Sequence, residues 1–170
     1  MNENATLLAA MAESKPVLLI GDSDSDRFPA TSFACYQKIG KVFHYLDMGS
    51  RDLSARSNGQ PILHSTDELG DWGGDLALIW VRAFSAVRAV ELAHGAGCKR
   101  IWFSFGVANP HALKLAEKLE IEVLEVGRCP VLFLSERVGP CRVHGWFADA
   151  FGLTQLAPQL HTGPERREFF

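Results

Sequence analysis

Residues 15–29 read KPVLLIGDSDSDRFP, and this stretch decides the fold. The apolar run Val17–Ile20 stops abruptly at Gly21, which is typical of a buried strand that enters a turn. Helical spacing of apolar residues follows from Pro29 to Ile39. Strand, tight turn and helix in this order begin a doubly wound α/β domain. Free backbone N–H groups and the helix dipole meet at such a turn, so it is a candidate phosphate site.

The same alternation continues along the chain. Helical patterns separate further segments that we interpret as strands, at Lys41–Leu46, Leu76–Val81, Arg100–Phe105 and Glu122–Val126, of which Leu76–Val81 is apolar throughout. We therefore predict an α/β fold with a Rossmann-like, doubly wound, mostly parallel five-stranded sheet and helices on both faces. Right-handed crossovers place every strand-exit loop at one edge of such a sheet, where ligands bind.

Local signals mark helix starts and a change in character near the end of the chain. Asn109 before Pro110 predicts a capped helix, and Ser65–Glu68 has the pattern of a capping box.

We assign residues 1–137 to a Rossmann-like domain. We assign residues 138–170, which include Trp146 and Phe147, to a C-terminal extension that packs on this domain or on a partner subunit.

Composition narrows the class of protein. The chain has 170 residues, a hydrophobic fraction of 47% and a net charge of −3, so it can form a core but has no general nucleic-acid surface. Its polar start does not resemble a signal peptide, and no apolar run approaches the roughly 20 residues of a membrane span. Four widely spaced cysteines favour reduced thiols. We expect a cytoplasmic protein with no nucleic-acid or membrane partner.

The sequence gives at most partial support to three other functions, which are dinucleotide binding, ester hydrolysis and metal binding. The dinucleotide fingerprint needs three glycines after the first strand, and only Gly21 is present. Because Asp47 could meet a ribose hydroxyl, NAD-type binding remains an alternative. Gly21–Ser23 resembles the opening of GDSL-type esterases, yet no aspartate has a histidine three residues later to supply the base. The six histidines show no i, i+4 pair, so we predict no metal site.

Several segments carry a resemblance to a known family across roughly residues 9–134. They are VLLIGDS at 17–23 with Arg27-Phe28-Pro29 behind it, LALIWVR at 76–82, IWFSFGVANP at 101–110 and GRCP at 127–130. In order and spacing they resemble the small stand-alone CoA-binding domain proteins, relatives of the CoA-binding domain of succinyl-CoA synthetase alpha subunits. The resemblance implies non-catalytic binding of coenzyme A or an acyl-CoA, through its ADP moiety, at the carboxyl edge of a Rossmann-like sheet.

The resemblance also implies roles for individual residues. Gly21 and Ser23 would approach the diphosphate, and Arg27 would bind it with charge-assisted hydrogen bonds. Val81 and Arg82 would border the nucleotide or the pantetheine arm. Gly106 and Asn109 would shape the side of the site opposite to the turn at Gly21. The full set of candidate ligand-binding residues is Gly21, Ser23, Ser25, Arg27, Asp47, Arg51, Val81, Arg82, Gly106 and Asn109. No catalytic residue is implied.

The chain departs from the family pattern near the ligand. Asp47 replaces an Asn-Pro pair after the second strand, and a carboxylate there repels a 3′-phosphate unless Arg51 or Arg56 offsets it. Ser104 stands where the family has glutamine, and Gly127 where it has aspartate. These departures and the aromatic end of the chain keep a second hypothesis open, a ligand-free interaction or dimerisation module that forms a homodimer.

Structural roles compete with the ligand-binding roles at several positions. Arg27 could pair with Asp24 or Asp26 instead of with a phosphate. We interpret Cys129, which precedes a proline, as a buried structural thiol rather than a reactive one. The aromatic residues expected in the core rather than against an adenine ring are Phe28, Trp80 and Phe105.

Overall fold

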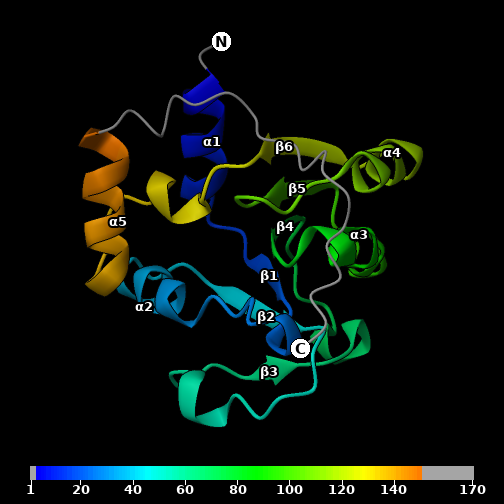
Figure 1. Ribbon diagram of the computed structural model, residues 1–170, viewed down its shortest axis with the longest axis horizontal. Coiled ribbons are helices and arrows are strands. Elements are labelled where there is room, and N and C mark those ends of the chain that lie inside the picture. Colours follow the sequence, from blue (N-terminus) through cyan, green and yellow to red (C-terminus); the bar gives the residue numbers. More distant parts are fainter. Residues whose placement is uncertain (1–2, 151–170) are drawn as a thin grey trace.

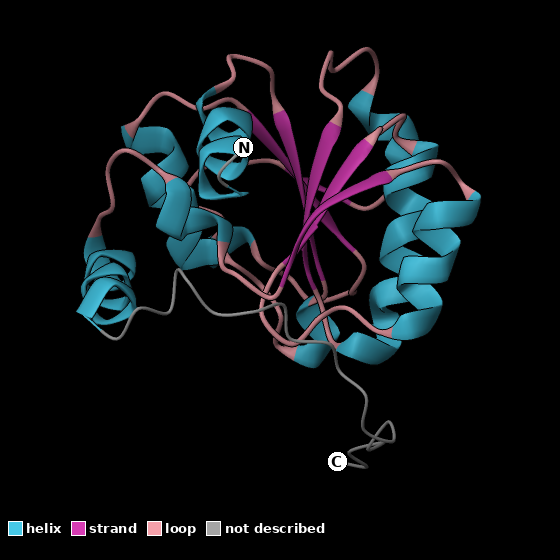
Figure 2. Ribbon diagram, turned by 90° about the horizontal axis from the view of Figure 1, so that it is seen from above, coloured by secondary structure: helices cyan, strands magenta, loops and turns pink. Residues whose placement is uncertain are grey.

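The computed structural model describes residues 3–150, which form a parallel sheet between two layers of helices (Figures 1 and 2). The strands are β1 (Val17–Gly21), β2 (Phe43–Asp47), β3 (Ile62–Leu63), β4 (Leu76–Trp80), β5 (Arg100–Phe103) and β6 (Glu122–Val126). The helices are α1 (Glu3–Ala12), α2 (Ala30–Lys38), α3 (Ala86–Gly95), α4 (Pro110–Lys118) and α5 (Gly139–Ala150). Short 3₁₀ turns lie in several of the connections.

The α/β, Rossmann-like fold predicted from the sequence is confirmed, but the sheet has six strands instead of five. Their order is β3-β2-β1-β4-β5-β6, and every pair of neighbours is parallel. The additional strand, β3, has two residues and pairs with Tyr45 and Leu46 of β2. The sequence predicts a short extended piece at Pro61–Leu63, but two residues are too few to show any periodicity, so only the pairing shows that they form a strand of the sheet.

Alternate residues of the central strands face two separate cores. Leu19, Leu78 and Trp102 point into the core beneath α1, α2 and α5. Leu18 and Ile79 point into the core beneath α3 and α4. Since both faces of the sheet are covered, the central strands are apolar throughout, as expected for buried parallel strands.

Helix α5 lies against the main body of the fold, next to α2 (Figure 1). Its Cys141 and Ala148 belong to the same buried cluster as Leu19 and Trp102. The Cys35 thiol of α2 contacts the backbone of Val138, which leads into this helix. The first part of the expected C-terminal extension therefore packs on the Rossmann-like body, and residues 151–170 lie outside the described part of the chain.

Both predicted helix-start signals are confirmed. The Asn109 side chain accepts a hydrogen bond of 2.9 Å from the Ala112 N–H at the start of α4. Ser65 and Glu68 form the reciprocal capping box of a 3₁₀ turn. Across residues 3–150, the helices are too short or too polar for any of them to cross a membrane.

Candidate functional site

The strand order reverses between β1 and β4, and this point defines the candidate site. From β1 the chain moves outward to β2, whereas from β4 it moves outward in the opposite direction to β5. Ligands of open α/β sheets bind at the carboxyl ends of the strands at such a reversal. The loop after β1, residues 22–29, and the residues after β4, Val81 and Arg82, meet at this edge.

The loop after β1 closes on itself. Asp22 and Arg27 exchange two backbone hydrogen bonds of 2.9 Å, and residues 23–25 between them form a 3₁₀ turn. Gly21 is required where this turn leaves the strand, because an added Cβ would lie 2.7 Å from the Arg27 carbonyl oxygen. Some backbone N–H groups of the turn therefore donate to the turn itself, and these groups are not available to a ligand.

The Asp47 carboxylate accepts hydrogen bonds from the Ser23 groups that, by the family resemblance, would bind a diphosphate. Its carboxylate is buried and accepts hydrogen bonds from the Ser23 N–H at 2.9 Å and from the Ser23 hydroxyl at 2.5 Å. The Tyr45 hydroxyl donates a third bond at 3.2 Å. Burial, and then the charge of Asp47, raise the pKa of Tyr45 well above its usual value, which keeps this hydroxyl a donor.

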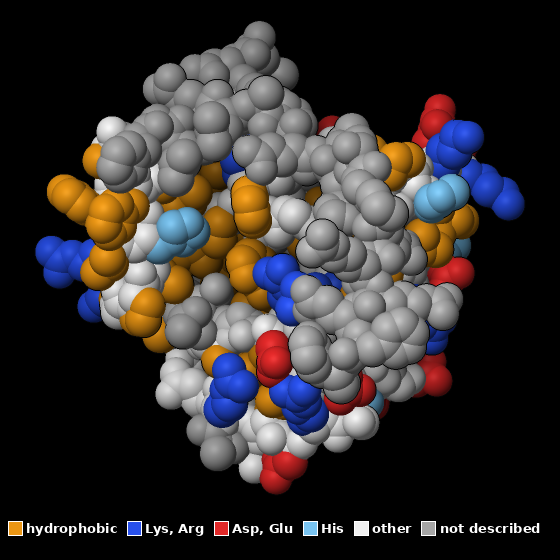
Figure 3. Space-filling view, viewed as in Figure 1, with side chains coloured by type: hydrophobic (Ala, Val, Ile, Leu, Met, Phe, Trp, Pro, Cys, Tyr) orange, Lys and Arg blue, Asp and Glu red, His pale blue; other side chains and the backbone are white. Residues whose placement is uncertain are grey.

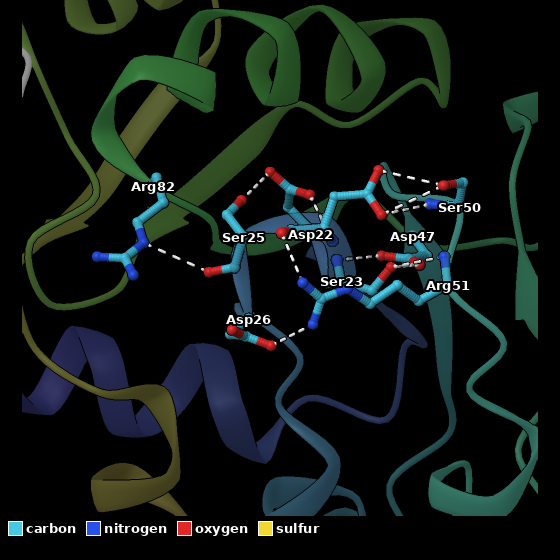
Figure 4. Close-up of polar contacts among 9 residues, drawn as sticks. Asp22, Ser23, Ser25, Asp26, Asp47, Ser50, Arg51 and Arg82 are labelled. Carbon is cyan, nitrogen blue, oxygen red and sulfur yellow. Dashed lines mark hydrogen bonds and ion pairs between the residues drawn. The ribbon is translucent and has the colours of Figure 1, made fainter. Parts of the chain in front are cut away.

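The other carboxylates of the loop are engaged locally as well (Figure 4). Asp22 accepts from the Asp24 N–H and from the Ser25 hydroxyl. Asp24 accepts from the Ser50 N–H at 3.1 Å. Arg51 pairs with Asp26 and donates to the backbone carbonyl of Asp24 at 3.0 Å, so it does not neutralise Asp47.

Arg27 and Arg82 differ from these engaged groups. Their guanidiniums form no ion pair with any residue in the described range 3–150. The Arg27 guanidinium carbon lies 5.6 Å from the centre of the Trp80 ring, and Arg82 donates to the Ser25 carbonyl at 3.4 Å. Burial, and then the nearby charge of Arg82, lower the pKa of Arg27. Two cationic groups thus share the strand-order reversal, and no carboxylate within residues 3–150 forms an ion pair with either of them.

Arg82 and the Asp47–Arg51 region lie on different sides of the turn. In Figure 4, Arg82 approaches Ser25 from the side opposite to Asp47 and Arg51. The pairing of Arg27 with Asp24 or Asp26, which the sequence left open, does not occur, since Asp26 pairs with Arg51.

The remaining candidate residues have mainly structural contacts. Val81 is buried in the core under α3 and α4. Asn109 caps α4 and also donates to the Ala83 carbonyl, which ties the loop after β4 to that helix. Gly106 has a φ of +69° and no atom within contact distance of an added Cβ, so it faces open space.

One of the three aromatic residues expected in the core lies outside it. Phe28 is buried and Trp80 is partly buried, but Phe105, in the loop after β5, is 56% exposed. The physical reason is that β5 ends at Phe103, so Phe105 is a loop residue and not a strand residue. Phe84, in the loop after β4, is exposed to a similar extent, 54%. Two aromatic side chains are therefore available at this edge.

A hollow opens beside Trp80 at the same edge. It runs between the ends of the central strands, α2 and the loop after β6, and its lining includes Leu19, Ser32, Tyr36, Leu78, Trp80, Ser104, Cys129 and Val131. Ser104, which the sequence marked only as a departure from a family pattern, lines this hollow. A polar residue directly after the apolar run Ile101–Phe103 was the available signal.

Cys129 lines the hollow as a protonated thiol. Burial raises the pKa of Cys129 to about 11. We expect iodoacetamide at pH 8 to alkylate native Cys129 about 100-fold more slowly than the urea-unfolded chain, since only the thiolate reacts. Mass spectrometry of the peptide that contains Cys129 measures both rates. Rates within a factor of ten of each other would contradict this expectation.

Comparisons with known proteins support the fold. No protein-family model matches the chain, and no curated protein matches it significantly. Among solved structures, it is similar to a hypothetical protein from Pyrococcus horikoshii OT3, with a TM-score of 0.63, 18% identity and coverage of 76% of this chain and 88% of the other. A protein redesigned for binding matches with the same values.

Another similar structure is a conserved hypothetical protein from Pyrococcus furiosus, with a TM-score of 0.55 and 20% identity over 69% of this chain and 97% of the other. At these identities the likeness shows the fold alone. The chain has a Rossmann-like α/β fold.

Proposed function

We propose that this protein binds coenzyme A or an acyl-CoA without catalysis, through the ADP moiety, at the carboxyl edge between β1 and β4. The observation that carries the proposal is the pair Arg27 and Arg82. Both guanidiniums lie at the strand-order reversal, and neither has an ion-pair partner among the described residues. The neighbouring aspartates, in contrast, are already engaged by hydrogen bonds or by Arg51.

A diphosphate fits the chemistry of this pair. Guanidiniums bind phosphate oxygens through two parallel charge-assisted hydrogen bonds. Two partly buried cations repel each other, and a group with two negative charges removes that repulsion on binding. We therefore assign the diphosphate to Arg27 and Arg82, and not to Ser23, whose N–H and hydroxyl donate to Asp47. Many ligands contain a diphosphate. We choose coenzyme A among them because residues 9–134 resemble the CoA-binding domain proteins.

NAD-type binding has less support. A ribose would need a free carboxylate at the end of β2. The Asp47 carboxylate is buried and accepts three hydrogen bonds from Ser23 and Tyr45.

Isothermal titration calorimetry with CoA, dephospho-CoA, ADP and NAD tests the proposal. We expect CoA to bind, and Arg27→Ala to weaken its affinity by about 10- to 100-fold, the effect of losing charge-assisted hydrogen bonds. Arg88→Ala is the matched control, because Arg88 is an exposed arginine of α3 that pairs with Glu91. A loss below tenfold in Arg27→Ala would remove the phosphate role of Arg27. Wild-type protein that binds none of the four ligands would remove the proposed function.

The rival hypothesis of an interaction module is favoured by one observation. Apolar side chains gather on the surface over α5 (Figure 3), where Trp146 is 65% exposed and Phe147 46% exposed. A protein that acts only through this surface should tolerate Arg27→Ala. It should also lose self-association or partner binding in Trp146→Ser, which analytical ultracentrifugation measures for the homodimer.

A further inference from the structure

The loop after β2, residues 48–51, lies directly on the turn after β1, and we call this loop the strap. The Ser50 N–H donates to the Asp24 carboxylate at 3.1 Å. The Arg51 guanidinium pairs with Asp26 and donates to the Asp24 carbonyl oxygen at 3.0 Å. Figure 4 shows Ser50 and Arg51 on the side of the turn opposite to Arg82. The strap is therefore bonded to one side of the turn only.

At Gly49 the strap touches the turn backbone to backbone. An added Cβ at Gly49 would lie 2.6 Å from the Asp24 nitrogen and 2.9 Å from the Ser23 nitrogen, so only glycine allows this approach. Just before it, the Met48 N–H donates to the Gly21 carbonyl at 2.9 Å. A ligand group cannot lie between the strap and the turn while these contacts hold.

The strap covers the place where a Rossmann-like fold holds the adenosine of a nucleotide. In such folds the diphosphate lies at the turn after the first strand and the ribose at the end of the second, so the adenosine lies between them. Here that space separates residues 22–27 from Asp47, and the Ser23 N–H and hydroxyl bridge it by their hydrogen bonds to Asp47. Arg27 and Arg82, in contrast, lie on the side of the turn that faces β4.

We propose that the strap is an autoinhibitory contact, which excludes the adenosine part of the ligand until the strap opens. This inference rests on the proposed function, because it concerns the nucleotide end of the same ligand. With the strap closed, Arg27 and Arg82 remain available to a diphosphate, but adenosine has no place. The apparent affinity for a ligand that contains adenosine is then its intrinsic affinity multiplied by the fraction of molecules with an open strap.

The ion pair between Arg51 and Asp26 is the contact that can be broken without disturbing the core. The two side chains are 50% and 74% exposed, and an exposed pair of this kind shifts an equilibrium by no more than about fivefold. The strap can therefore open while the sheet stays folded. Arg51 is a positioning residue in this proposal, because it acts on the ligand through the strap.

Inorganic pyrophosphate and ADP are the matched ligands for the test, because only ADP carries adenosine. In calorimetry we expect Arg51→Ala to bind ADP about three- to tenfold more tightly than the wild-type protein does, since both bonds of the guanidinium are lost. Its affinity for pyrophosphate should stay within about twofold of the wild-type value, because an exposed charge on the far side of the turn is largely screened.

Asp26→Asn breaks the same ion pair from the other side and should also strengthen ADP binding. Asparagine suits the position, because the residue has a φ of +55°. The two variants change the net charge in opposite directions, so a long-range effect of charge would shift their affinities in opposite directions. Arg51→Lys keeps a cation for Asp26 and should bind ADP much as the wild-type protein does.

Hydrogen exchange followed by mass spectrometry measures the strap itself. We expect the amides of residues 48–51 to exchange about three- to tenfold faster in Arg51→Ala, because the open fraction is larger. In the wild-type protein, ADP should also speed exchange in these residues, whereas pyrophosphate should not. Arg88→Ala, which breaks an exposed ion pair on α3, is the control and should change neither exchange in the strap nor ADP binding.

The possible results separate the strap from the proposed function. Weaker ADP binding in Arg51→Ala would overturn the strap and make Arg51 a ligand contact, and slower exchange in residues 48–51 with ADP would overturn it too. Unchanged ADP binding in both Arg51→Ala and Asp26→Asn, together with intact pyrophosphate binding, would overturn the strap and leave the diphosphate site standing. Binding of neither ligand to any of these proteins would overturn the proposed function, and the role of the strap with it.

Discussion

Glu125→Ala is expected to lower the free energy of unfolding by about 3–5 kcal/mol, the largest effect of any single substitution considered for this protein. Glu125 and Arg128 form an ion pair in which both side chains are buried, 1% and 7% exposed. The Arg128 Nε–H donates to Glu125 Oε2 at 2.5 Å. Removal of the carboxylate takes a buried opposite charge away from the Arg128 guanidinium, and the hydrogen bond from Arg128 to Asn4 offsets only part of that loss.

Urea denaturation measures this loss, and β6 contains its own control. Glu122 begins the same strand with an exposed side chain, so Glu122→Ala should change stability by no more than about 0.5 kcal/mol. Substitution of both partners by leucine should recover much of the loss, because a buried ion pair adds little over an apolar pair of similar size. Equal effects of Glu125→Ala and Glu122→Ala would show that the buried pair does not stabilise the fold.

Asp47→Ala is expected to lower the free energy of unfolding by about 2–4 kcal/mol. The substitution strands three donors, the Ser23 N–H, the Ser23 hydroxyl and the Tyr45 hydroxyl, in a buried position. Unsatisfied buried donors cost about 1–3 kcal/mol each, and relaxation or water entry recovers part of this. Because these Ser23 donors already bind Asp47, the proposed function places the diphosphate on Arg27 and Arg82.

Asp47→Asn separates charge from hydrogen bonding in this prediction. The amide oxygen keeps an acceptor for the Ser23 N–H, so the loss should be less than half of that in Asp47→Ala. Asp71→Ala is the control, because Asp71 is an exposed loop aspartate, and its effect should stay within about 0.5 kcal/mol. Thermal and urea unfolding measure all three variants. A loss in Asp47→Ala as small as in Asp71→Ala would mean that water replaces the carboxylate at no cost.

Local signals in the sequence were sufficient for the class of fold. Apolar runs such as Val17–Ile20 and Leu76–Trp80 are bounded by turn residues, and buried parallel strands require such runs. The start of α4 followed from Asn109 and Pro110, because capping depends on neighbouring residues only. These features need no information from distant parts of the chain.

The two-residue strand β3 and the surroundings of Glu125 depended on tertiary structure. In β6, the pairing with β5 shifts by one residue between Ile101 and Trp102, so that Trp102 lies opposite Glu125. An irregularity of this kind turns a side chain to the other face of the sheet. The charged residue thereby lies in the interior, where Arg128 meets it. No periodicity in the sequence encodes that shift.

The candidate site divides in the same way. The sequence by itself determined that Gly21, Ser23, Arg27, Asp47 and Arg82 share the carboxyl edge, because right-handed connections between parallel strands bring their exits together. Only the tertiary structure decided which charges are free. Ser23 binds Asp47, Arg51 binds Asp26, and Arg27 lies over the Trp80 ring. Pairing of this kind depends on distances of a few ångströms between distant residues, and a sequence does not specify those distances locally.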